Sequence, residues 1–259
     1  MNFTETVILA AFAGGTIFLG LPVGRLGGLS PRVRVTLAAA SAGVILFLLV
    51  EILGHAIEPV EDALTAARDG GSAAEFATRA VALVGGLVLG LLSVTYLTRR
   101  LSGSPLGGVS PRHMALGTAA GLGLHNFSEG LAIGQSAAIG ATTLALVLVV
   151  GFALHNTTEG FAIGAPLGLG DRPTWRFLGL TGVIGGGPTF LGGVVGYSFV
   201  SPVLSIAFLS LAAGALIFVF NEIMAASRRF SMPMVASAAL SLGFIVALGT
   251  ELVLELAGA

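Results

Sequence analysis

The chain has 259 residues, of which 55% are hydrophobic and only 10% are charged. A soluble domain carries about 25% charged residues, so this composition excludes one and indicates a polytopic membrane protein. The chain contains no cysteine, which excludes a disulfide scaffold, a zinc ribbon and a thiol nucleophile. Its net charge of -1, with no block of basic residues, excludes nucleic acid as a partner.

Eight segments are long and apolar enough to cross a bilayer, which takes about 20 mostly apolar residues. No connecting segment is long enough to hold a further domain, so residues 1–259 are predicted to form one all-α integral-membrane domain. In the sixth segment, residues 185–188 (GGGP) could break the helix in mid-membrane. The eight predicted spans are residues 7–24, 35–55, 79–98, 113–138, 141–167, 177–199, 202–224 and 234–256.

The arginines orient these spans. Ten of the twelve basic residues follow spans one, three, five and seven, and only Arg68 and Arg79 lie on the opposite side. Basic residues are concentrated in the cytoplasmic loops of membrane proteins, so both termini are predicted to lie outside the cytoplasm. The chain is therefore expected in the cytoplasmic membrane, with the lipid bilayer as its surroundings. The ten are Arg25, Arg32, Arg34, Arg99, Arg100, Arg112, Arg172, Arg176, Arg228 and Arg229.

Spans four and five repeat one motif, HNFSEGLAIG from His125 and HNTTEGFAIG from His155. On a helix, the His, Asn and Glu at positions i, i+1 and i+4 share an arc of about 100°. Both copies lie near the middle of their spans, so two sets of polar side chains are predicted to face each other at the bilayer midplane. The six candidate metal ligands are His125, Asn126, Glu129, His155, Asn156 and Glu159.

These residue types suit a divalent metal ion. Imidazole, amide and carboxylate groups bind zinc, iron, manganese or cadmium, with zinc favoured here as the substrate ion. A single copy of the motif would fit helix packing equally well. A charge at the bilayer centre, however, costs about 2.5–3.5 kcal/mol on insertion scales. Two copies at matched depth are therefore hard to explain by packing alone.

Further polar residues mark a predicted path through the membrane. Glu51 and His55 on span two and Glu251 on span eight lie toward the outer side. Asn221 and Glu222 lie near the cytoplasmic end of span seven. We predict that these residues relay the ion rather than bind it tightly.

The paired motifs resemble the signatures of the ZIP (zinc/iron-regulated-transporter-like) metal transporters, especially their GufA-like prokaryotic branch. The resemblance implies eight spans, external termini, a metal site between spans four and five, and the six motif residues as ligands. It also implies that Asn221 and Glu222 match a pair near the cytoplasmic exit. This chain has Ser128 and Thr158 where the family usually has proline, which leaves the family's helix kinks open here. Residues 185–189 lack the glutamate that many members use as a further ligand, which leaves open a one-metal or two-metal site.

The expected function is inward transport of a divalent metal ion rather than enzymatic catalysis. The chain has no GxxxxGK[ST] motif, which excludes ATP coupling within it. Two alternatives remain: a proton-coupled cation antiporter that uses Glu129 and Glu159, and a membrane-embedded metalloenzyme, against which the missing HExxH motif argues. The sequence leaves open the metal, the coupling ion, whether the chain acts as a carrier or a channel, and whether it forms a homodimer.

Overall fold

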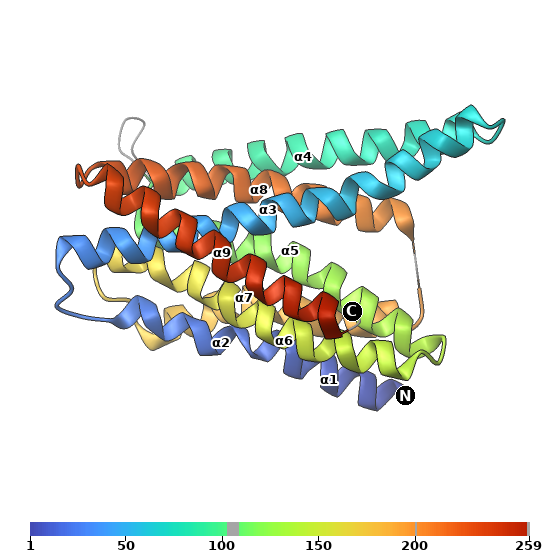
Figure 1. Ribbon diagram of the computed structural model, residues 1–259, viewed down its shortest axis with the longest axis horizontal. Coiled ribbons are helices and arrows are strands. Elements are labelled where there is room, and N and C mark those ends of the chain that lie inside the picture. The colour runs from blue at the N-terminus through green and yellow to red at the C-terminus, as the bar shows by residue number, and fades with distance from the viewer. Residues whose placement is uncertain (103–108, 200, 258–259) are drawn as a thin grey trace.

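The computed structural model describes residues 1–102, 109–199 and 201–257, without the side chains of residues 97–98, 101–102, 253–255 and 257. The fold is all-α, and its helices lie roughly along one common direction (Figure 1). Two short 3-10 helices, η1 (Leu21–Arg25) and η2 (Ala165–Leu169), extend α2 and α6. The α-helices are α1 (Phe3–Gly15), α2 (Ile17–Gly20), α3 (Pro31–Arg68), α4 (Ala73–Ser102), α5 (Pro111–Ala138), α6 (Thr142–Gly164), α7 (Trp175–Gly196), α8 (Pro202–Arg228) and α9 (Pro233–Ala257).

Helices α3, α5 and α8 each begin at a Ser-Pro pair. Ser30, Ser110 and Ser201 are the N-cap residues, and each hydroxyl accepts a hydrogen bond from the backbone N–H three residues later. The proline that follows occupies the first helical position, where an N–H would have no helical partner. These pairs fix where the three helices start, at the ends of their apolar stretches.

Seven helical segments of the described chain are long and apolar enough to cross a membrane. Helix α5 has the length, 28 residues, but is not among them. Its motif residues are polar, and α5 packs inside the molecule against α6, α7 and α8. Seven of the eight predicted spans thus correspond to helices that are long and apolar enough to cross a membrane, and the crossing by α5 stays a prediction. The seven are Phe3–Arg25, Pro31–Arg68, Ala73–Tyr96, Thr142–Leu169, Trp175–Gly196, Pro202–Arg228 and Pro233–Leu252.

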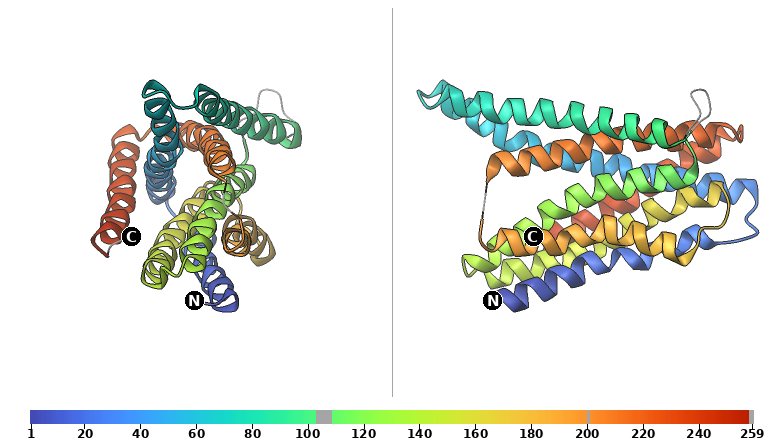
Figure 2. Two further views of the ribbon diagram at one scale, coloured as in Figure 1. Left: turned by 90° about the vertical axis from the view of Figure 1, so that its right-hand side faces the viewer. Right: turned by 180° about the vertical axis from the view of Figure 1, so that it is seen from behind.

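The helices form two groups that are visible in the end-on view of Figure 2. The first bundle consists of α1, α2, α5, α6 and α7, and its closest packing is between α5 and α7. The second bundle consists of α3, α4, α8 and α9, in which α4 packs on α8 and α3 packs on α9. The two bundles meet mainly where α5 lies on α8, with smaller contacts of α3 and α9 with α6.

Helix α7 runs unbroken from Trp175 to Gly196, so the break considered at residues 185–188 does not occur. Proline inside a helix removes a backbone hydrogen bond and usually bends it. Here α7 stays helical through Pro188, and small residues allow its backbone to touch neighbours on two sides. A methyl group on Gly186 would collide with the carbonyl oxygen of Gly14 on α1, and one on Gly130 of α5 would collide with that of Thr189.

Helix α3 continues well beyond the predicted end of its span at residue 55. It includes Pro59 and ends at Arg68, and α4 begins at Ala73. Residues 58–79, which are rich in acidic side chains, therefore belong to a helical hairpin rather than to a loop. Arg79 of α4 donates a hydrogen bond of 2.8 Å to the carbonyl oxygen of Pro59. This contact joins the two helices of the hairpin, whose turn projects beyond the rest of the molecule (Figure 1).

Candidate metal site

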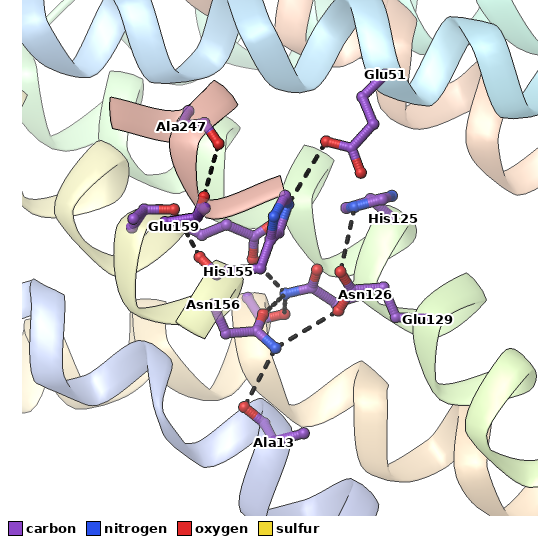
Figure 3. A network of polar contacts seen from close by, with 12 residues as sticks. Ala13, Glu51, His125, Asn126, Glu129, His155, Asn156, Glu159 and Ala247 are labelled. Carbon is purple, nitrogen blue, oxygen red and sulfur yellow. Dashed lines mark hydrogen bonds and ion pairs between the residues drawn. The ribbon is translucent and has the colours of Figure 1, made fainter. Parts of the chain in front are cut away.

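A tight turn places the two copies of the motif opposite each other. Gly140 joins α5 to α6 in the left-handed conformation, with φ of 81°, which glycine adopts without strain. The N–H of Ala141 donates to the carbonyl oxygen of Ser136 across this turn. The helices therefore run antiparallel from a fixed point, and the rings of His125 and His155 lie 5.9 Å apart between centroids (Figure 3).

The two asparagines connect the copies. Asn126 Nδ2 donates to Asn156 Oδ1 at 2.7 Å and to Glu159 Oε2 at 2.6 Å. Asn156 Nδ2 lies 3.5 Å from Glu129 Oε2. Each amide thus reaches the glutamate of the other helix. This exchange between helices matches the predicted facing of the two sets of polar side chains (Figure 3).

Two backbone carbonyls complete the amide contacts. Asn156 Nδ2 donates to the carbonyl oxygen of Ala13 at 3.1 Å, and that of Gly185 lies 3.1 Å from Asn126 Nδ2, where it can only share one of the two hydrogens already donated to Asn156 and Glu159. Ala13 is near the end of α1, where the helix breaks at Thr16, and Gly185 has no side chain to cover its carbonyl. Sequence reasoning did not find these partners. The only local signal for them was the glycines in both segments.

Glu51 joins the two histidines. His155 Nε2 lies 3.9 Å from Glu51 Oε2 and 3.8 Å from Glu159 Oε1, while His125 Nε2 lies 3.5 Å from Glu129 Oε1. One ligand atom from each of Glu51, His125 and His155 can be chosen so that all three lie within 4.8 Å of one another. The sequence assigned Glu51 only to the path. The structure places it in the candidate site.

Several atoms of the site that could bind a metal ion are buried and have no hydrogen-bond partner. His125 is 3% exposed, His155 1% and Glu159 0%. More than about 90% of buried polar groups in proteins have a partner, so a cluster without partners is a place where a ligand such as a metal ion could bind. Within the described residues, the unpartnered atoms of this site are Glu51 Oε2, both ring nitrogens of His125 and of His155, Asn126 Oδ1 and Glu159 Oε1.

A cavity of about 430 Å³ leads to the site. Its wall includes His55 and Glu251, as the predicted path requires, together with Glu51, His125 and Glu129. The other described lining residues are Ser128, Leu131, Ala132, Gln135, Leu148, Phe152, Ser205 and Leu209.

Sequence reasoning missed three polar residues of this cavity wall, of which Ser205 lies on α8 and the other two lie on α5. Ser128 and Gln135 follow His125 by three and ten residues, a spacing that keeps them on one face of α5. That spacing was the signal that would have found them.

Asn221 and Glu222 lie elsewhere. They are close to the end of α8, the end that carries Arg228 and Arg229, and neither is among the described residues of the cavity wall. Their position agrees with the predicted cytoplasmic side of span seven. Their predicted role in ion release stays a prediction.

No family model matches this chain, and a search of the curated proteins found no significant match. The functional argument therefore depends on the site and on the motif resemblance.

The residues of the site could hold a metal ion. Two imidazoles and one carboxylate form a donor set that is common for zinc and for iron(II). Because the donors are buried among membrane helices, an ion bound there would be shielded from water on most sides. The carboxylates of Glu129 and Glu159 would offset its charge.

Proposed function

We propose that this chain transports divalent metal ions, zinc foremost, across the cytoplasmic membrane into the cell. The observation that carries the proposal is the buried group of Glu51, His125 and His155 in a helical membrane protein, with donor atoms that lack partners. An ion cannot enter hydrocarbon without such donors, since charge transfer into it is costly. The resemblance of the paired motifs to those of ZIP transporters supports the same function.

We also propose that α5 crosses the membrane, which gives eight crossings. Both termini lie toward the same end of the molecule (Figure 1), which requires an even number of crossings. The ten arginines of the predicted cytoplasmic side lie at the other end, where α3, α5, α7 and α9 begin. The positive-inside rule then places both termini outside the cytoplasm.

The cavity supports an inward direction of transport. It is lined by Gln135 near the end of α5, by Ser205 near the start of α8 and by Glu251 near the end of α9. All three lie at the end of the molecule with few arginines, which is the proposed outer side. Ions outside the cell could therefore enter the cavity and reach the site from there. A membrane potential of 100 mV contributes about 2.3 kcal/mol per charge, or about 4.6 kcal/mol for a dication that enters a negative interior. Uptake therefore needs no ATP.

One rival function has an observation in its favour. Two histidines and a glutamate beside an open cavity are also the ligand set of zinc hydrolases. A membrane-embedded metalloenzyme would use the cavity for a substrate rather than as an entry route. A proton-coupled antiporter would use the same site but would exchange protons for metal.

Zinc flux into proteoliposomes that hold a fluorescent zinc indicator separates these functions. We expect wild-type protein to give flux that is driven by an inside-negative potential, and His155→Ala to lose most of it. Glu58→Gln, which changes an exposed glutamate on α3, is the matched control and should keep it. An enzyme would give no flux, an antiporter would require a counter-gradient of protons, and wild-type flux through His155→Ala would overturn the proposal.

A further inference from the structure

The candidate site takes its donors from both helix bundles. His125 and His155 belong to α5 and α6 of the first bundle, whereas Glu51 belongs to α3 of the second. In Figure 3, Glu51 reaches the imidazoles from the opposite side to the asparagine pair. Of the three residues whose ligand atoms gather within 4.8 Å, it is the one from the second bundle.

Each bundle is closely packed within itself. In the first bundle, a methyl group on Gly160 of α6 would collide with the carbonyl oxygen of Ile17 on α2. In the second, one on Gly43 of α3 would collide with the carbonyl oxygen of Leu240 on α9. Backbones in direct contact at these positions pack the helices of one bundle closely together, so we treat each bundle as one body.

The surface between the bundles is different. Gly117 and Gly121 of α5 face the side chains of Val219 and Ala215 on α8, at 3.2 Å and 3.1 Å from the position of an added methyl group. Side chains rather than backbones therefore meet at this boundary. Glu51 thus offers a polar connection across a boundary that is otherwise formed by apolar side chains at these positions.

A bound ion would strengthen that connection. Zinc holds nitrogen and oxygen ligands at about 2.0–2.2 Å in a tetrahedral arrangement, so two ligand atoms of one ion lie about 3.3 Å apart. Glu51 Oε2 and His155 Nε2 are 3.9 Å apart, slightly more than one ion requires. Binding would draw the carboxylate of α3 toward the imidazoles of α5 and α6. Residues 185–189 of α7 offer no acid in its place.

We propose, on the basis of the transport function above, that the substrate ion itself fastens the two bundles together through Glu51. The first bundle supplies the imidazoles and the nearby carboxylates of Glu129 and Glu159, and the second supplies the carboxylate of Glu51, so the loaded protein is held in one relative position of the bundles. The ion must leave Glu51 before the bundles can separate. Glu51 is thus both a ligand and the residue that couples ion occupancy to the arrangement of the helices.

The chain has no cysteine, so paired spin labels can measure the distance between the bundles in the intact protein. Suitable positions are Ile139, which is 80% exposed at the turn after α5, and Glu61, which is exposed on the outer part of α3. Ile139→Cys and Glu61→Cys are combined with wild-type Glu51, with Glu51→Gln or with the control Glu58→Gln. Distance distributions are recorded in lipid with EDTA and with saturating Zn²⁺, and bound zinc is counted by elemental analysis.

We expect Zn²⁺ to narrow the distribution about twofold in the wild-type and Glu58→Gln backgrounds, because a ligand that joins two bodies restricts their motion. Glu51→Gln should still bind zinc at saturation, with an affinity lower by roughly 10–100-fold. Its distance distribution should not narrow when zinc binds. Narrowing that persists in zinc-loaded Glu51→Gln, or zinc binding by the wild type without narrowing, would overturn the bridge and leave transport standing. A wild-type protein that binds no zinc would overturn both.

Discussion

Replacing Asn126 with alanine tests whether the crossed amides hold the site together. The substitution removes the donor to Glu159 Oε2 at 2.6 Å and to Asn156 Oδ1 at 2.7 Å. Both acceptors are fully buried, and Asn126 itself is 0% exposed. Water cannot replace the lost donor without opening the packing of α5 against α7. Two buried acceptors would therefore be left without a partner.

The magnitude follows from these two losses. Each buried polar group without a partner costs about 1–3 kcal/mol, so Asn126→Ala should lower the free energy of unfolding by about 2–6 kcal/mol. An ordinary hydrogen bond between membrane helices contributes only about 0.6 kcal/mol. A loss of about 2–6 kcal/mol in the free energy of unfolding can be distinguished experimentally from a loss of about 0.6 kcal/mol. Asn221→Ala, at an exposed position of α8, should stay within about 0.5 kcal/mol of the wild type.

The assay is unfolding by SDS in mixed micelles with EDTA present, so that bound metal does not add stability. The chain has a single tryptophan, Trp175 at the start of α7, whose ring lies under the guanidinium of Arg25 at 4.5 Å. Its fluorescence should report the loss of this contact. A change below about 1 kcal/mol for Asn126→Ala would refute the reasoning, because the acceptors would then have found other partners.

Three further predictions follow from the site and the topology. Glu159→Ala should lose most metal uptake in proteoliposomes while inserting into the membrane normally, because a charge is removed from mid-membrane; wild-type uptake would contradict its role as a ligand. Metal binding, measured by equilibrium dialysis, should weaken as the pH falls from about 7.5 to 5, since protons compete for imidazole and carboxylate donors; constant binding would exclude the histidines. Glu58→Cys and Arg228→Cys should react with impermeant reagents from opposite sides of the membrane, and reaction from one side would show that the proposed orientation is wrong.

The local features of this protein could be read from its sequence. Apolar length predicted the positions of the helices, because a membrane helix satisfies its backbone within its own segment. The repeat of the His125 motif at His155, at matched depth in neighbouring spans, was enough to predict two facing sets of ligands. Two neighbouring helices joined by a short turn can pack against each other in only a few ways, so the residues that face each other can be predicted from the local sequence.

Only the tertiary structure decided which distant groups complete the site. The sequence assigned Glu51 to the path and not to the site, and its position beside His155 depends on how α3 lies against α6. The carbonyls of Ala13 and Gly185 carry no side-chain signal at all. The unbroken course of α7 through Pro188 likewise depends on the backbones packed against it. Helix rotation and separation are set by contacts between segments far apart in the chain, and the periodicity within one segment does not record them.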